Sequence, residues 1–208
     1  MLIEKNVTDF IDVLASASPA PGGGSVSALA GSLGAALTAM VCRLTLGNEK
    51  YSDVQAKAGS MLKQADELKN LLQKYVDEDT EAFNKVMAAY KLPKDTEEQK
   101  TDRSQAIQQA MQNAASLPLK VAEYCLTIIT MAEQILRLGN ANAASDAAVA
   151  GLISHAGMQG AIYNVRINLA SIKDQQFVET TQAQVDAIKS QAAVQYGKLI
   201  ATADKAIG

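Results

Sequence analysis

The chain has 208 residues, and its 19 basic and 22 acidic residues give a net charge of −3 at pH 7. This length fits one large domain or two small ones, and no linker composition separates two, so we expect a single domain over residues 1–208. The mild acidity disfavours nucleic-acid binding, which normally needs a basic face. Aromatic residues make up 4% and tryptophan is absent, which favours an all-α protein over sheets.

Two cysteines and one histidine limit the metal chemistry of the chain. Cys42 and Cys125 lie far apart without a CxxC pair, whereas a zinc or iron–sulfur site needs about four clustered ligands. We expect no metal site, and free buried thiols rather than a disulfide. Glu4 and Asp9 interrupt the segment where a signal peptide would be apolar, so we expect a cytoplasmic protein.

A first short helix is expected over residues 7–17, with Asn6 or Thr8 as its N-cap. Its inward side chains are expected to be Phe10, Ile11, Val13, Leu14 and Ala17. The segment 18–24 (SPAPGGG) then breaks the helix.

Ser25 is expected to cap a second helix, which runs to Leu46 and is apolar almost all round. Such a helix is either buried or spans a membrane. Its apolarity comes largely from alanine and glycine, and Arg43 lies inside it, so we favour burial. Small residues recur every four positions: Ser27, Gly31, Ala35 and Ala39, with Ala30, Gly34 and Thr38 in a parallel row. These rows predict a helix at the centre of a bundle or on a dimer axis, and we expect a homodimer or higher oligomer.

A long third helix is expected from the capping-box pattern at residues 52–55, with Ser52 as the cap, to Tyr90. Its apolar seam is interrupted once, by Asp79. A carboxylate there costs several kcal/mol of desolvation unless it is paired or hydrogen-bonded. Asp79 is therefore either half of a structural ion pair or a site group.

The sequence of the second half of the chain predicts four more helices. Thr96 to Gln99 is a second capping box, which opens a polar, peripheral helix through Ser116. Pro118 starts or kinks an apolar helix that Gly139 can end.

Ser145 is expected to cap the next helix, which runs to Ile172, and residues 178–207 form the last one. One stripe of the helix after Ser145 is small in its middle and polar at both ends: Asp146, Ala150, Ile153, Gly157, Gly160 or Ala161, Asn164 and Asn168. The whole pattern predicts a multihelical up-and-down bundle with long antiparallel helices.

Two polar clusters mark the beginnings of helices. Gly22, Gly23, Gly24 and Ser25 open the buried helix, where free backbone N–H groups could hold an anion or polar ligand, although a glycine run can also be a simple turn. The other cluster comprises Asn140, Asn142, Ser145 and Asp146, which are also ordinary capping choices.

A third cluster is Asn164-Val165-Arg166-Ile167-Asn168, in which two amides four residues apart share a helix face. Such amides can bind the donor and acceptor edges of a heterocycle, or bond to one another across helices. His155 has no recognisable partner motif, and we interpret it as structural.

Three segments resemble the cyclodeaminase/cyclohydrolase family of folate enzymes: FIDVLASASPAPGGGSVSALAGSLGAALTAMVCRLTLGNEKY, GNANAASDAAVAG and GAIYNVRINLASI. The likeness extends from about Asn6 to Lys189. It implies a multihelical, usually dimeric fold that acts on a tetrahydrofolate one-carbon unit without metal or redox cofactor. Any formimidoyltransferase step is expected to be absent or to be left to a partner.

The resemblance implies either of two reactions, the hydrolysis of methenyltetrahydrofolate to formyltetrahydrofolate or the closure of formimidoyltetrahydrofolate with loss of ammonia. Both need proton transfer beside a delocalised cation, a task that suits carboxylates. Asp79 and Asp146 are the candidate catalytic residues, with their roles unassigned. The candidate substrate-binding residues are Gly22, Gly23, Gly24, Ser25, Asn140, Asn142, Asn164 and Asn168, with Arg43 and Arg166 for the folate glutamate. The alternatives are a non-catalytic helical interaction module and a folate-binding protein.

Overall fold

The computed structural model describes residues 1–208 and contains helices, turns and no strand. The α-helices are α1 (Val7–Leu14), α2 (Gly23–Thr45), α3 (Gln55–Tyr90), α4 (Glu97–Leu138), α5 (Ala144–Leu169) and α6 (Gln175–Ile207). Three short 3-10 helices join them: η1 (Leu2–Glu4), η2 (Glu49–Val54) and η3 (Ala141–Ala143). The expected all-α class is confirmed.

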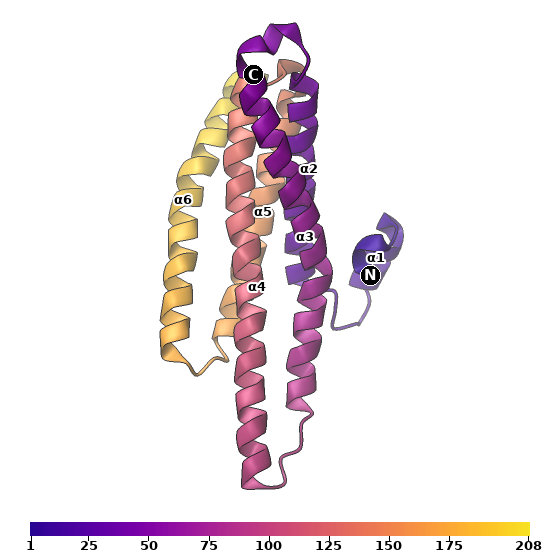
Figure 1. Ribbon diagram of the computed structural model, residues 1–208, viewed down its shortest axis with the longest axis vertical. Helices are drawn as coiled ribbons and strands as arrows, with labels where there is room; N and C mark the ends of the chain where they lie inside the picture. Colours follow the sequence, from indigo (N-terminus) through magenta and orange to yellow (C-terminus); the bar gives the residue numbers. More distant parts are fainter.

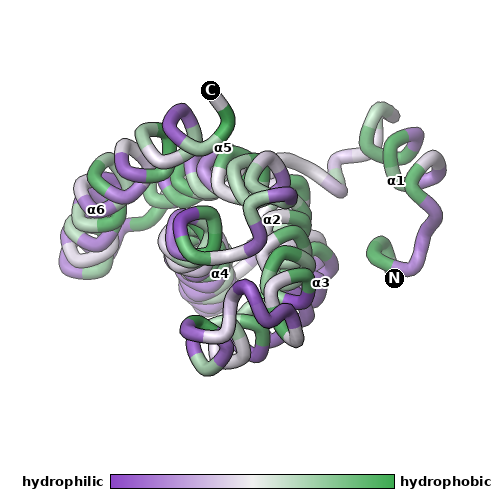
Figure 2. The backbone as a smooth tube through the Cα atoms, turned by 90° about the horizontal axis from the view of Figure 1, so that it is seen from above, coloured by the Kyte–Doolittle hydropathy of each residue, from purple (hydrophilic) through white to green (hydrophobic).

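Helices α2 to α6 run up and down beside one another, whereas α1 stands apart on a linker (Figures 1 and 2). α2 and α5 are antiparallel neighbours, because Gly34 of α2 meets Ser154 and Gly23 meets Asn164. The α3–α4 hairpin extends well past the start of α2 (Figure 1). The end of the α2–α5 pair therefore lies against the side of a longer hairpin.

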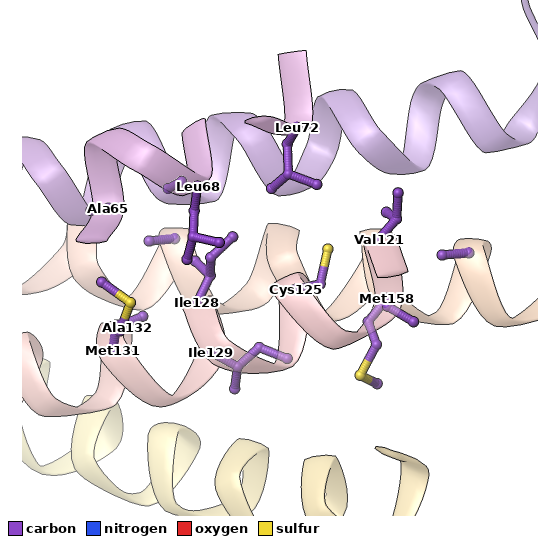
Figure 3. Close-up of a cluster of buried hydrophobic side chains, with 14 of the residues drawn as sticks. Ala65, Leu68, Leu72, Val121, Cys125, Ile128, Ile129, Met131, Ala132 and Met158 are labelled. Carbon is purple, nitrogen blue, oxygen red and sulfur yellow. The ribbon is translucent and has the colours of Figure 1, made fainter. Parts of the chain in front are cut away.

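The core lies where α2, α3, α4 and α5 meet. Leu72, Ile128 and Met158 are fully buried there, among the side chains that Figure 3 shows. Burial raises the pKa of Cys42 to about 11 and that of Cys125 to about 12, so both remain free thiols at neutral pH. The prediction of free thiols is confirmed.

The small residues of α2 allow the other helices to approach closely. A Cβ on Gly31 would lie 2.8 Å from the Cys125 sulfur and 3.1 Å from a Leu72 methyl. All four residues of the row, Ser27, Gly31, Ala35 and Ala39, are buried within the chain. The row lies at the centre of the bundle, and the alternative that placed it on a dimer axis is wrong.

Two helices are long and apolar enough to cross a bilayer, namely α2 and α4. Of their most apolar windows, 61% and 50% are buried inside the chain, and core helices of soluble proteins pass the same test. Their composition is accounted for by the bundle interior.

The prediction of two helices on either side of Pro118 is wrong, because α4 continues through it from Glu97 to Leu138. Proline lacks the N–H that would bond to the carbonyl four residues earlier, which belongs to Ala114. The Asn168 side chain donates to this carbonyl oxygen at 2.8 Å. A side chain of α5 thus satisfies the acceptor that the proline leaves free. Gly139 is the C-cap, as predicted.

The sequence predicts the N-caps of some helices correctly and those of others wrongly. Asn6 caps α1, and Thr96 with Gln99 forms the expected capping box of α4. Ser25, Ser52 and Ser145 are not N-caps, since their helices begin after Gly22, Val54 and Ala143. Gly22, Val54 and Ala143 have no side-chain capping hydrogen bond, and α3 and α5 directly follow the 3-10 helices η2 and η3.

The terminal helices also differ from expectation. α1 ends at Leu14 and buries Phe10, but Ile11, which was expected to face inward, is 54% exposed. α6 begins at Gln175, earlier than predicted, because Asp174 caps it through the Phe177 N–H.

Replacing Gly31 with leucine is expected to destabilise the protein by about 1–3 kcal/mol or more, because the core has no room for the side chain. Gly59→Leu is the matched control, since a Cβ at this α3 glycine meets no atom within 4 Å and leucine favours helix. Urea unfolding monitored by circular dichroism measures both. Equal stability of the two variants would contradict the close packing of α2.

Candidate active site

A pocket of about 310 Å³ lies where α2 begins, α5 ends and the α3–α4 hairpin passes both. Half of the site residues predicted from sequence line it: Gly22, Gly23, Gly24, Asp79, Asn164 and Asn168. The rest of the lining is mainly apolar: Pro19, Ala20, Ala82, Phe83, Val86, Met87, Tyr90, Met111 and Ala114. An apolar cavity with a few convergent polar groups is the usual form of a small-molecule site.

Sequence reasoning missed the hairpin wall of this pocket. Phe83, Met87 and Tyr90 follow Asp79 at intervals of four, eight and eleven residues, which places them on the same side of α3. That spacing was visible in the sequence. Neither Phe83 nor Met87 was predicted as a site residue, and the overhang of the hairpin leaves these side chains beside the cavity.

Asp79 lies against the first turn of α2. Its carboxylate oxygen is 3.0 Å from the Ser25 hydroxyl, which is also 2.9 Å from the Val76 carbonyl oxygen. A Cβ on Gly24 would collide with the Asp79 carboxyl group. The close approach therefore depends on glycine, and it places the carboxylate by the free N–H groups at the positive end of the helix.

No lysine or arginine pairs with Asp79, so the interpretation as a structural ion pair is wrong. Burial raises the pKa of Asp79 above its ordinary value of 3.8, and hydrogen bonds from Ser25 offset part of this rise. A carboxyl group with a raised pKa exchanges its proton closer to neutral pH, as acid–base chemistry requires.

The amide groups of the two asparagines are held in place by hydrogen bonds to the protein. Asn164 donates its amide hydrogen to the Gly160 carbonyl oxygen at 2.8 Å, and Asn168 donates to Ala114. Each bond uses one of the two N–H groups of the amide, so the second N–H group and the oxygen are left for a ligand. The pocket thus presents two amide groups and one carboxylate.

The second polar cluster lies at the other end of α5. Asn140 caps η3 and donates to the Leu44 carbonyl oxygen at 3.0 Å, while Asn142 and Asp146 follow it. Asp146 precedes Asn164 by 18 residues, or about 27 Å along the helix. A single chain therefore does not bring the Asp146 end and the Asp79 pocket together.

The predicted cationic anchors also lie outside the pocket. Arg43 pairs with Asp66 at 2.6 Å, at the far end of α2. Arg166 is exposed on the outer side of α5 and makes no ion pair. Neither of them lines the cavity.

His155 stacks on Tyr196 of α6, with ring centroids 3.9 Å apart, and does not line the pocket. Burial lowers its pKa. No group of three or more His, Cys, Asp or Glu side chains comes together as a metal site would require.

Comparison with known proteins accounts for these motifs. The model of the formiminotransferase-cyclodeaminase family matches residues 6–187. The chain belongs to this family. Both ends of α2 and α5, and hence the pocket and the Asp146 cluster, fall within the match.

Two relatives show how the family domain is used. The chain is 39% identical over 188 residues to a methenyltetrahydrofolate cyclohydrolase of Methylorubrum extorquens, covering 90% of each chain. It is 33% identical over 202 residues to the formimidoyltransferase-cyclodeaminase of Rattus norvegicus, where the match covers 95% of this chain but 37% of the rat protein. The chain thus spans about a third of the bifunctional relative.

The fold is also that of a solved relative. The crystal structure of formiminotetrahydrofolate cyclodeaminase from Thermotoga maritima matches with a TM-score of 0.90 at 28% identity, covering 100% of both chains. The helical bundle of this protein is therefore the fold of the family.

Replacing Gly24 with serine is expected to cost about 1–3 kcal/mol, because the new side chain would displace the Asp79 carboxyl group or the start of α2. Gly22→Ser is the matched control: no atom lies within 4 Å of its Cβ position, and serine is a good N-cap. Thermal unfolding compares the two. A Gly24→Ser protein as stable as Gly22→Ser would contradict the contact with Asp79.

Asp79→Asn is expected to leave stability unchanged or raised at neutral pH. A pKa raised in the folded state stabilises the fold below the ordinary value of 3.8, and this contribution is lost as pH rises through the folded value. The melting temperature of Asp79→Asn should therefore gain on the wild type as pH increases from about 4 to 8. Asp186→Asn, at an exposed position on α6, is the control that should show no such gain. A marked loss of stability at pH 7 would instead mean that the Asp79 charge supports the fold.

Proposed function

We propose that this protein is a folate one-carbon enzyme that hydrolyses methenyltetrahydrofolate to formyltetrahydrofolate. The observation that carries the proposal is the unpaired, half-buried Asp79 carboxylate at one end of an otherwise apolar pocket. The cyclohydrolase relative, aligned over 90% of both chains, supports this reaction. Closure of formimidoyltetrahydrofolate with loss of ammonia is the second candidate, and the Thermotoga maritima cyclodeaminase, which matches over its whole length, supports it.

Both reactions take place at the carbon that bridges two folate nitrogens. In the hydrolysis, water adds to the methenyl cation, a proton leaves, and one carbon–nitrogen bond then breaks to give the formyl product. In the closure, the second nitrogen attacks the formimidoyl carbon and ammonia departs. Each passes through a tetrahedral carbon and leaves its oxidation state unchanged. We therefore propose that no redox cofactor takes part, and no metal.

Asp79 is proposed to move the proton in either direction. Ionised, it accepts a proton from the attacking water and offsets the charge of the methenyl cation. Protonated, it donates to the departing amine. Its raised pKa brings these two states closer in free energy. The hydrogen bond from the Ser25 hydroxyl holds the Asp79 carboxyl group in place.

The remaining lining is proposed to hold the pterin. Phe83, Met87 and Tyr90 supply an apolar and aromatic wall for a flat ring, and the amide groups of Asn164 and Asn168 form hydrogen bonds with its polar edge. The N–H groups of Gly23 and Gly24 offer donors on the opposite side. This division of roles matches a heterocycle with donors and acceptors on different edges.

The proposal includes a homodimer in the cytoplasm, with no nucleic-acid or membrane partner. The net charge of −3 supports the absence of a nucleic-acid partner. The named relatives are metabolic enzymes.

Asp79→Asn is expected to lower methenyltetrahydrofolate turnover by a hundredfold or more, the usual scale for a positioned acid–base group, with the fold intact. Loss of the methenyl absorbance measures the rate, and ammonia release from formimidoyltetrahydrofolate measures the second reaction. Asp186→Asn is the control and should retain wild-type turnover.

Three outcomes of the same assay would contradict the proposal. Full activity of Asp79→Asn would remove this residue from the chemistry. A stoichiometric spectral shift without turnover would indicate a folate-binding protein. No response from the wild type would indicate an interaction module.

A further inference from the structure

Asn164 and Asn168 line the same pocket, but their amide groups are held in different ways. Asn164 donates to the Gly160 carbonyl oxygen, four residues earlier in its own helix. Asn168 instead donates to a neighbouring helix, α4, where the Ala114 carbonyl oxygen accepts the bond at 2.8 Å. The orientation of the Asn168 amide group therefore depends on the backbone of a second helix.

The Ala114 carbonyl can accept this bond because of the residue that follows it by one helical turn. A backbone carbonyl inside a helix normally accepts from the N–H four residues later. In α4 that position is Pro118, which has no N–H, and a proline ring also clashes with the carbonyl four residues earlier. Pro118 thus leaves the Ala114 oxygen free for a donor from outside α4, at a place where Ala114 itself lines the pocket.

Two glutamines of α4 hold the turn after α5 independently of this bond. Gln108 donates to the Ser171 carbonyl oxygen at 3.1 Å and accepts from the Lys173 N–H at 2.7 Å. Gln112 donates to the Asp174 carboxylate at 3.2 Å. These contacts keep the end of α5 against α4 even when the asparagine contributes nothing. A change in the asparagine's hydrogen bond is therefore expected to affect the pocket and not the fold.

We propose that Pro118 is a positioning residue of the pocket: it frees the Ala114 carbonyl oxygen, which then fixes the Asn168 amide group for the ligand. The inference rests on the proposed function for the identity of the ligand, a pterin, but not for the arrangement of the three residues. It gives a reason for a buried proline within a helix of 42 residues, where proline is otherwise unfavourable. Pro118 itself does not line the cavity and acts through Asn168.

Pro118→Ala restores the missing N–H and is expected to return the Ala114 oxygen to the hydrogen bonds of α4. The melting temperature should stay unchanged or rise, because alanine favours helix far more than proline does. The KM for methenyltetrahydrofolate should rise about threefold to tenfold, the scale of one hydrogen bond, with kcat nearly unchanged. Pro93→Ala is the matched control and should keep the wild-type KM, because this exposed proline of the α3–α4 turn does not line the pocket.

A second variant connects the proline with the asparagine. Asn168→Ala removes the amide group and is expected to raise the KM at least as much as Pro118→Ala does. The double variant should have the KM of Asn168→Ala alone, because the proline acts only through that side chain. Additive effects of the two substitutions would mean that Pro118 acts by another route, and would overturn the inference.

The arrangement is also tested without activity. The side-chain amide signal of Asn168 is identified in ¹⁵N-labelled protein by its loss in Asn168→Ala. Its hydrogen exchange with water should be about tenfold faster in Pro118→Ala than in the wild type, because the hydrogen bond that protects it is lost. The signal of Asn164 is the internal control and should not change, since its acceptor belongs to α5.

The outcomes separate this inference from the proposed function. A Pro118→Ala protein with the wild-type KM, or with unchanged exchange of the Asn168 amide, overturns the inference and leaves the proposed function standing. A marked fall in its melting temperature overturns the inference too, because the proline would then serve the fold. A wild type that turns over neither folate substrate ends the proposed function, and the amide exchange then decides the arrangement by itself.

Discussion

The contact between the Asp79 carboxyl group and the first turn of α2 is the interaction on which the site depends. Burying a carboxylate costs several kcal/mol without compensation. Here the Ser25 hydroxyl and the positive end of α2 supply part of the compensation. The contact requires glycine at position 24, and it joins the start of one helix to the middle of another. Without it, neither the depth of the pocket nor the position of the carboxyl group would be fixed.

Much of the fold could be predicted because helical periodicity is a property of many residues at once. The buried α2, the long α3 and the Thr96 capping box all follow from such patterns. Single-residue signals were less reliable. Ser25 and Ser145 had the chemistry of caps, but both lie inside helices that begin before them. Pro118 did not end a helix, because Asn168 supplied the missing hydrogen bond from another part of the chain, which no local pattern encodes.

The site was predictable to a similar extent. Asp79 could be found because it interrupts an apolar seam, and the glycine and asparagine motifs because they are unusual in a helical chain. Their grouping could not be found. Whether Asn140 or Asn164 joins Asp79 depends on which end of an antiparallel helix pair each one occupies. That is decided by three-dimensional packing, which linear motifs do not record.

The two walls of the pocket differ in how closely they pack against the rest of the molecule. On the α2 wall, Gly24 leaves no room for a Cβ beside the Asp79 carboxyl group. Phe83, Met87 and Tyr90 stand on the overhanging hairpin, and none of them belongs to the main core cluster. Substitutions on the hairpin wall therefore carry a small penalty in folding, and a substitution at Gly24 carries a larger one. Evolution is consequently free to alter the hairpin side of the pocket while the Asp79 side stays constant. A single ancestral bundle could diversify in this way without passing through unfolded intermediates.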